Sequence, residues 1–196
     1  AGGIRWQYMP TDNFSQIEII KGASSVLYGS SALNGIINFR LADAGNIPST
    51  RFYAETGFYS PPESSAWKWW SSPRIFGSES VNHLRRIGNT DIGGGLFLLA
   101  ESSYRKYNDD KLARISLRVK QRSEKVKGLV YGLNFTGALN TKTDFILWED
   151  ADSGALKQDT STVSLLNARF MTIDPYISFD RKGRFRHDFR MRVQAS

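Results

Sequence analysis

The sequence of 196 residues predicts an all-β fold, and three observations lead to that prediction. From Gly45 onward, apolar and polar residues alternate with the two-residue period of strands, in segments separated by turn signals. Almost no stretch keeps a helical period long enough to predict a helix. No run approaches the roughly 18 consecutive apolar residues of a transmembrane helix. We therefore expect a series of antiparallel strands.

The first expected element is a pair of short strands around a centre of glycine, serine and alanine. Residues 16–40 read QIEIIKGASSVLYGSSALNGIINFR, with isoleucines at both ends and glycines at positions 22, 29 and 35. Isoleucine-rich ends suit strands, while glycine and serine suit a tight connection where backbones approach closely.

Further strands are expected along the rest of the chain, at 51–59, 76–87, 95–105, 114–120, 129–140, 171–179 and 184–193. The least regular is Phe76–Ile87, because the residues HLRR at 83–86 fit a strand poorly. Pro175 cannot donate to a ladder, so we expect a bulge or an unpaired position there.

Each of the later strands has one apolar and one charged face. We expect the apolar set to face lipid: Ile115, Leu117, Leu133, Phe135, Ile173, Ile177, Phe189 and Met191. The opposite set would form a cationic wall: Arg118, Lys120, Arg186, Arg190 and Arg192. That wall is either solvated charge or a path that attracts anionic ligands such as ferric chelates.

The connections alternate in length. Long ones at 61–74 and 150–167 would lie outside, together with the connection at 106–111, and short ones at 123–128 and 180–184 would lie inside, together with 88–91. This alternation is typical of outer-membrane barrels, whereas the strand pattern alone also fits a soluble sandwich.

The run from Ile17 to Gly45 resembles the closing segment of the plug domain in TonB-dependent outer-membrane receptors. The matching motifs are Ile17-Glu18, Lys21-Gly22, Leu27-Tyr28-Gly29-Ser30, Asn34-Gly35 and Ile36-Ile37-Asn38. The plug-motif residues are accordingly Gly22, Tyr28, Gly29, Asn34 and Gly35. Lys21 stands where the family more often has arginine, and Ala23 where proline is common. The alternative is a glycine-rich hairpin of a soluble β domain.

The resemblance implies a fragment of a plugged transmembrane β-barrel, with roughly 22 antiparallel strands when complete. Residues 1–46 would be the C-terminal part of an α+β plug domain, and residues 47–196 the first strands of the barrel, about seven in number. The chain would then begin inside the plug and stop inside the barrel.

The resemblance also implies a function: active import of a scarce ligand across the outer membrane of a Gram-negative bacterium, driven by the inner-membrane partner TonB. The ligand would be a ferric siderophore, cobalamin or an oligosaccharide, and TonB would contact a segment that is not in this chain. Outer-membrane lipid and a surface lipoprotein are further candidate partners. The alternatives are a soluble β-rich glycan-binding module and a passive plugged porin or adhesin.

Other functional classes are not expected. No catalytic constellation is present in the sequence, so we expect neither an enzyme nor a cofactor. Cysteine is absent and only two histidines occur, so no metal site is expected. The net charge of +7 would suit nucleic acid, but the basic residues alternate along strands and do not form a stacking groove.

Two sets of residues are candidate functional sites. Trp67, Trp69 and Trp70 offer stacking faces and N–H donors to a ligand, although an interfacial belt or loop packing would also account for them. By resemblance, Lys21 would fasten the plug to an acidic residue of the barrel wall, with Glu55 and Glu101 as partners. Each of these charges could instead pair with a neighbouring strand.

Overall fold

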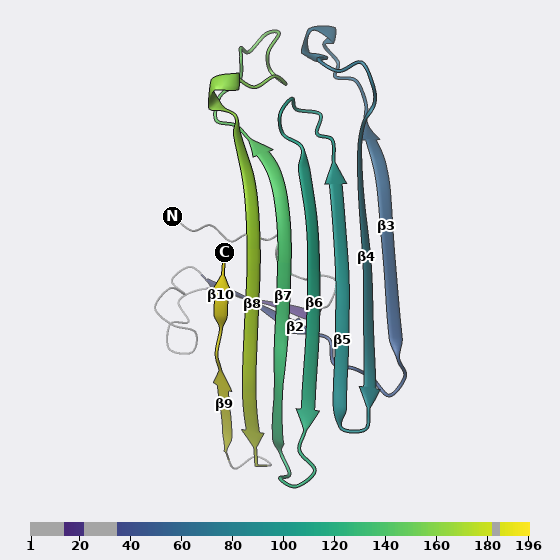
Figure 1. The fold of residues 1–196 in the computed structure, drawn as a ribbon, viewed down its shortest axis with the longest axis vertical. Helices are drawn as coiled ribbons and strands as arrows, with labels where there is room; N and C mark the ends of the chain where they lie inside the picture. The colour runs from purple at the N-terminus through teal and green to yellow at the C-terminus, as the bar shows by residue number, and fades with distance from the viewer. Residues whose placement is uncertain (1–13, 22–34, 182–184) are drawn as a thin grey trace.

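The computed structural model describes residues 14–21, 35–181 and 185–196, and these form two antiparallel sheets (Figure 1). A two-stranded sheet contains β1 (Phe14–Lys21) and β2 (Gly35–Leu41). The other sheet contains eight strands, β3 to β10, in the order β10-β8-β7-β6-β5-β4-β3, with β9 also paired to β8. The all-β prediction is confirmed.

The small sheet is the expected pair of short strands. Ile19 lies opposite Ile37 and Ile17 opposite Phe39 in an antiparallel register, and the rings of Phe14 and Phe39 stack with their centroids 4.7 Å apart. The connection between the two strands lies outside the described residues.

From β3 to β8 the large sheet is a meander in which each strand pairs with the next, and β9 and β10 both pair with β8 (Figure 1). Its strands are β3 (Ser49–Tyr59), β4 (Arg74–Ile87), β5 (Thr90–Glu101), β6 (Asp110–Arg122), β7 (Leu129–Asp144), β8 (Ser164–Asp180), β9 (Arg186–Arg190) and β10 (Val193–Ala195). The long connections, with 3₁₀ turns at Ser65–Trp67 and Thr160–Thr162, lie at one end of the sheet, and the short turns lie at the other.

The irregular segment around His83 is a full strand, β4, which pairs with β3 over residues 74–84 and with β5 over residues 76–87. Its polar residues fall on both faces. Ser78, Ser80 and Asn82 are buried on one side, whereas His83 points to the other and shares a 2.8 Å hydrogen bond with Thr50 of β3. Because β3 and β5 together pair with the whole backbone of β4, this strand does not need a clean apolar alternation.

Pro175 lies at a position of β8 where a backbone N–H is not needed, as was expected. On one side of β8 its register with Leu133 is unbroken. On the other side its carbonyl accepts a 3.1 Å bond from the Met191 N–H, between the end of β9 and the start of β10. The missing N–H of proline therefore coincides with the break between these two edge strands.

The two faces of the large sheet differ in polarity. What we call the outer face carries seven residues of the expected apolar set, which the register places on one side: Ile115, Leu117, Leu133, Phe135, Ile173, Ile177 and Phe189. The opposite side, the inner face, buries mostly polar side chains, among them Ser78, Ser80, Asn82, Asp91, Arg114, Ser116, Asn140 and Thr172. This arrangement is the reverse of a sheet that covers an apolar core.

The inner face has one apolar cluster, near the long connections. Leu112 and Ala138 are buried there and contact Phe97 and Phe170. The Arg114 guanidinium lies 4.7 Å above the Phe97 ring, so even this cluster is bordered by charge. Within the described residues, no helix has the length and apolar character needed to cross a membrane.

Candidate functional site

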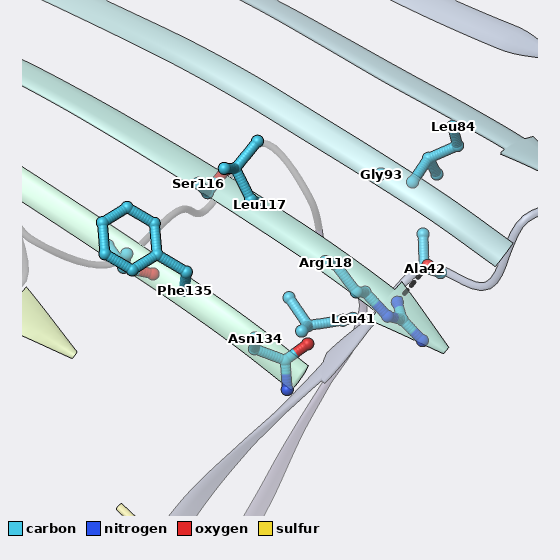
Figure 2. Close-up of a pocket in the computed structure, with 10 residues that line it drawn as sticks. Leu41, Ala42, Leu84, Gly93, Ser116, Leu117, Arg118, Asn134 and Phe135 are labelled. Atoms are coloured by element: carbon cyan, nitrogen blue, oxygen red, sulfur yellow. Dashed lines mark hydrogen bonds between the residues drawn. The ribbon is translucent and has the colours of Figure 1, made fainter. Parts of the chain in front are cut away.

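Residues 42–46, which we call the junction segment, connect the small sheet to the large one and contact the inner face. Arg118 of β6 donates to the Ala42 carbonyl, and Figure 2 shows its guanidinium directed at that oxygen. The same guanidinium lies 2.6 Å from Asp43 Oδ1, and Lys120 Nζ lies 2.9 Å from that carboxylate oxygen. Two cations of one strand thus hold the start of the junction segment.

The end of the junction segment is held from β4. Arg86 donates to the Ala44 carbonyl and, at 3.3 Å, to the side chain of Asn46. Its Nε also lies 2.7 Å from Asp91, whose second oxygen is 2.6 Å from Arg122. The Asp91 side chain is only 4% exposed, and a buried carboxylate requires such partners. Asp91 therefore fixes the position from which Arg86 reaches the junction segment.

The Asp43 carboxylate is held in its charged form. Partial burial by itself raises the pKa of Asp43, but the hydrogen bonds and charges of Lys120 and Arg118 outweigh burial and bring that pKa below its usual value. The Asp43 side chain remains 55% exposed, so solvent screens these ion pairs. Such contacts orient two surfaces with little net stability, and they can be broken and remade.

A small cavity of about 30 Å³ lies beside the junction segment. Figure 2 shows its lining, which includes Leu41, Leu84, Gly93 and Asn134. A Cβ at Gly93 would lie 2.7 Å from Leu84 Cδ2, so glycine gives the leucine room there. Within the described residues, the buried Asn134 Oδ1 accepts no hydrogen bond. A cavity of this size has room for about one water molecule, and Asn134 Oδ1 is an acceptor for it.

The predicted partners Lys21, Glu55 and Glu101 are not joined by an ion pair in the part of the chain that the structure describes. Lys21 ends β1 and is exposed. Glu55 accepts hydrogen bonds from Tyr53 at 2.6 Å and Ser78 at 2.8 Å. Glu101 accepts one from Tyr59 at 2.6 Å. Both glutamates lie on the inner face as expected, and their pairing with Lys21 stays a prediction.

The three tryptophans lie in the β3–β4 connection and contact the other long connections. Trp67 Nε1 donates to the Asp152 carbonyl, and Trp69 Nε1 donates to the Tyr104 carbonyl at 2.8 Å. Trp70 is buried and packs edge-on against Trp69, with ring centroids 5.7 Å apart. Both of these N–H donors are thus committed to loop carbonyls, which favours the packing explanation over ligand contact.

The same end of the sheet carries a cationic and aromatic cluster that the sequence did not single out. The Arg105 guanidinium lies 5.2 Å from the Tyr104 ring and 5.5 Å from the Trp148 ring. Arg74 lies 4.8 Å above Trp69. These residues come from three connections, and the one signal available in the sequence was that all three were expected on the same side. Within the described residues, no group of three histidine, aspartate or glutamate side chains could hold a metal ion.

Of the five plug-motif residues, one lies within the described residues and four do not. Gly35 opens β2 opposite Lys21. Gly22, Tyr28, Gly29 and Asn34 lie outside the described residues. Sequence analysis missed Asp43, although it did select Arg118 and Lys120, the two cations that bind it.

Two comparisons with known proteins found similar sequences. The family model described as the TonB-dependent Receptor Plug Domain matches residues 1–36. A hemin receptor of Yersinia enterocolitica is 24% identical over 151 residues, which is 76% of this chain and 21% of that protein. The chain thus spans about a fifth of the length of this relative. No solved structure matches the chain.

Proposed function

We propose that the chain is part of a TonB-dependent receptor and that the complete protein actively imports a scarce ligand across the outer membrane of a Gram-negative bacterium. The observation that carries this proposal is the order of the parts. A segment that matches the plug domain precedes a meander whose inner face is polar and whose outer face is apolar. A soluble glycan-binding module would have the opposite distribution.

We propose that the plug extends through residue 46 and that the barrel begins at residue 47. The end of β2 at Leu41 and the start of β3 at Ser49, in a different sheet, support this boundary. The junction segment is then the tether of the plug, and Arg86, Arg118 and Lys120 are the residues of the barrel wall that hold it.

The contacts of the junction segment suit a plug that must detach from the barrel wall during import and bind to it again afterwards. Pulling by TonB on an upstream segment would load the tether, and half-exposed ion pairs resist such a load only weakly. Asp91, buried between Arg86 and Arg122, stays with the wall and keeps the cations in place for re-docking. In this mechanism the tether is released and rebound without change in the wall.

For the ligand we propose an anionic iron chelate, with hemin as the first candidate to test. The relative is named a hemin receptor, although at 24% identity this name alone does not transfer. The Arg105, Tyr104 and Trp148 cluster supports a planar, negatively charged ligand, because it offers aromatic rings and a positive charge at the end of the sheet that carries the long connections.

Growth assays with the full-length protein test this proposal. A strain that lacks other iron receptors would be supplied with hemin, a ferric siderophore or no iron source, in the presence and absence of TonB. We expect growth on hemin that requires both the receptor and TonB. Uptake without TonB would favour the alternative of a passive porin. Growth on the siderophore but not on hemin would contradict hemin as the ligand and would leave the proposal of a TonB-dependent receptor intact.

A further inference from the structure

We propose that Tyr176 of β8 is a positioning residue for the tether of the plug, because its hydroxyl holds Arg118 in the direction in which that arginine binds the junction segment. This inference deepens the function proposed above and rests on it, since the junction segment acts as a tether only in a plugged receptor. It assigns a role to a residue that sequence analysis did not select.

The Tyr176 side chain lies over Gly132 of the neighbouring strand β7. The register places Gly132 opposite Tyr176 on one side and opposite Lys120 of β6 on the other, and all three lie on the inner face. A Cβ at Gly132 would lie 2.7 Å from the Tyr176 hydroxyl oxygen and 2.8 Å from Cζ of its ring. Because glycine has no side chain, the ring can extend over β7 and bring its hydroxyl toward β6.

The Tyr176 hydroxyl meets a guanidinium of β6. Arg118 donates a hydrogen bond to this oxygen, and Asp43 and Asp91 lie close enough to act on it electrostatically. Arg118 is on the same face, two residues from the position directly across β7 from Tyr176. A guanidinium has five N–H donors in one plane, so Arg118 can bind Tyr176 while it also binds Ala42 and Asp43.

Arg118 needs an acceptor that stays with the wall. Its side chain is only 16% exposed, whereas that of Asp43 is 55% exposed. When the tether leaves, Arg118 loses Asp43 and the Ala42 carbonyl, and a largely buried guanidinium without acceptors is costly. The Tyr176 hydroxyl belongs to β8 and remains. It also restricts the rotamers of a long side chain, so the guanidinium keeps its direction until the tether returns.

The partner of Arg118 in the wall is neutral, unlike the partner of Arg86. Arg86 is paired with Asp91, which offsets its charge, and it binds the tether through a backbone carbonyl. Within the described residues, the one carboxylate paired with Arg118 is Asp43 of the tether. A hydroxyl accepts a hydrogen bond without cancelling the positive charge, so Arg118 keeps its full attraction for Asp43. Tyr176 therefore suits an arginine that must bind an acidic partner again after each release.

Amide hydrogen exchange on the full-length receptor tests this role. Tyr176→Phe keeps the ring over Gly132 and removes only the hydroxyl. Tyr131→Phe is the matched control, because Tyr131 directly precedes Gly132 on β7 and lies on the outer face. Exchange in the junction segment is measured for both variants, for Arg118→Gln and for Arg86→Gln. Each arginine variant is also combined with Tyr176→Phe.

We expect Tyr176→Phe to speed exchange in the junction segment roughly fivefold, which corresponds to about 1 kcal/mol, the usual net contribution of one hydrogen bond. It should have no further effect in the Arg118→Gln background, because the hydroxyl acts through that guanidinium. In the Arg86→Gln background the two effects should add. The control should match the wild type, and the strand amides of β7 and β8 should keep their wild-type exchange rates in every Tyr176 variant.

Wild-type exchange in Tyr176→Phe would overturn the proposal. So would an equal increase in the wild-type and Arg118→Gln backgrounds, since the hydroxyl would then act independently of Arg118. Faster exchange throughout β7 and β8 would also overturn it, because Tyr176 would then support the sheet as a whole. Growth on hemin with and without TonB is measured for the same variants. Failure of the wild type in that assay would contradict the proposed function, while the exchange rates would still decide whether Tyr176 positions Arg118.

Discussion

Asp43 Oδ1 lies 2.6 Å from the guanidinium of Arg118, a residue 75 positions later in the sequence. This pair joins the segment after β2 to the middle of the large sheet. Lys120, the next inner-face residue along β6, shares the same oxygen at 2.9 Å. Asp43 is therefore one of the residues through which a displacement of the small sheet would reach the large sheet, together with Ala42 and Ala44.

The first prediction concerns the strength of this pair. Asp43→Asn and Arg118→Gln should each loosen the junction segment, and the double variant should show a coupling of about 0.2–1 kcal/mol, since Asp43 is half exposed. Amide hydrogen exchange at residues 42–46 of the full-length receptor measures the loosening. Asp152→Asn, in an exposed loop, is the control, and strictly additive effects would contradict the pairing.

The second prediction is the pH dependence of the junction. The pKa of Asp43 is lowered in the folded protein, so its contribution is fully present above the unfolded value of about 3.9 and is lost as the pH falls through the folded pKa. Exchange at the junction should therefore be independent of Asp43 protonation from pH 7 to 5 and should rise below about pH 4. In Asp43→Asn this rise should be absent; an identical rise would assign it to another group.

The third prediction tests Lys21 against its proposed glutamate partners. Lys21→Glu should increase leakage of small antibiotics and reduce import, because it would bring like charges together, and adding Glu55→Lys or Glu101→Lys should restore part of both. Tyr53, Ser78 and Tyr59 already donate to these glutamates, so a modest coupling is expected. No restoration in either pairing would leave Lys21 as an ordinary surface charge.

The fourth prediction concerns the outer face. Leu133→Arg should destabilise the full-length receptor in lipid vesicles by roughly 2–4 kcal/mol if this residue lies near the bilayer midplane. Val130→Arg, on the inner face of the same strand, is the matched control and should cost much less. Urea unfolding in vesicles measures both variants. Equal destabilisation would mean that the two faces of β7 do not differ in environment.

The fifth prediction separates packing from ligand contact among the tryptophans. Trp70→Ala should open the β3–β4 connection to limited proteolysis, because this ring is only 8% exposed and packs on Trp69. Trp67→Phe, which removes only the donor to Asp152, should leave the connection protected. If Trp67→Phe instead weakened ligand binding without faster proteolysis, the ligand role would stand and the packing explanation for Trp67 would fail.

The sequence by itself predicted that these segments are strands and which residues share a face, because both depend on local chemistry. The strand ends differ, since β8 begins at Ser164 and not at 171, and the expected strand at 184–193 forms β9 and β10. The two-residue period put Leu117, Phe135 and Ile173 on one side before any register was known, and β pairing then aligned them. Pro175 was likewise predictable, since its lack of an N–H forbids one bond whatever the surroundings. Even β4, the least regular segment, was expected as a strand at 76–87.

Only the tertiary structure decided which charges meet. Sequence analysis selected Arg118 and Lys120 but not Asp43, because a contact between residues 75 apart depends on the path of the junction segment across the sheet. The same holds for Trp69 and Tyr104, which belong to different connections. Strand periodicity fixes the side on which a residue lies, whereas register, strand order and loop path fix its partner, and these arise from interactions across the whole sheet.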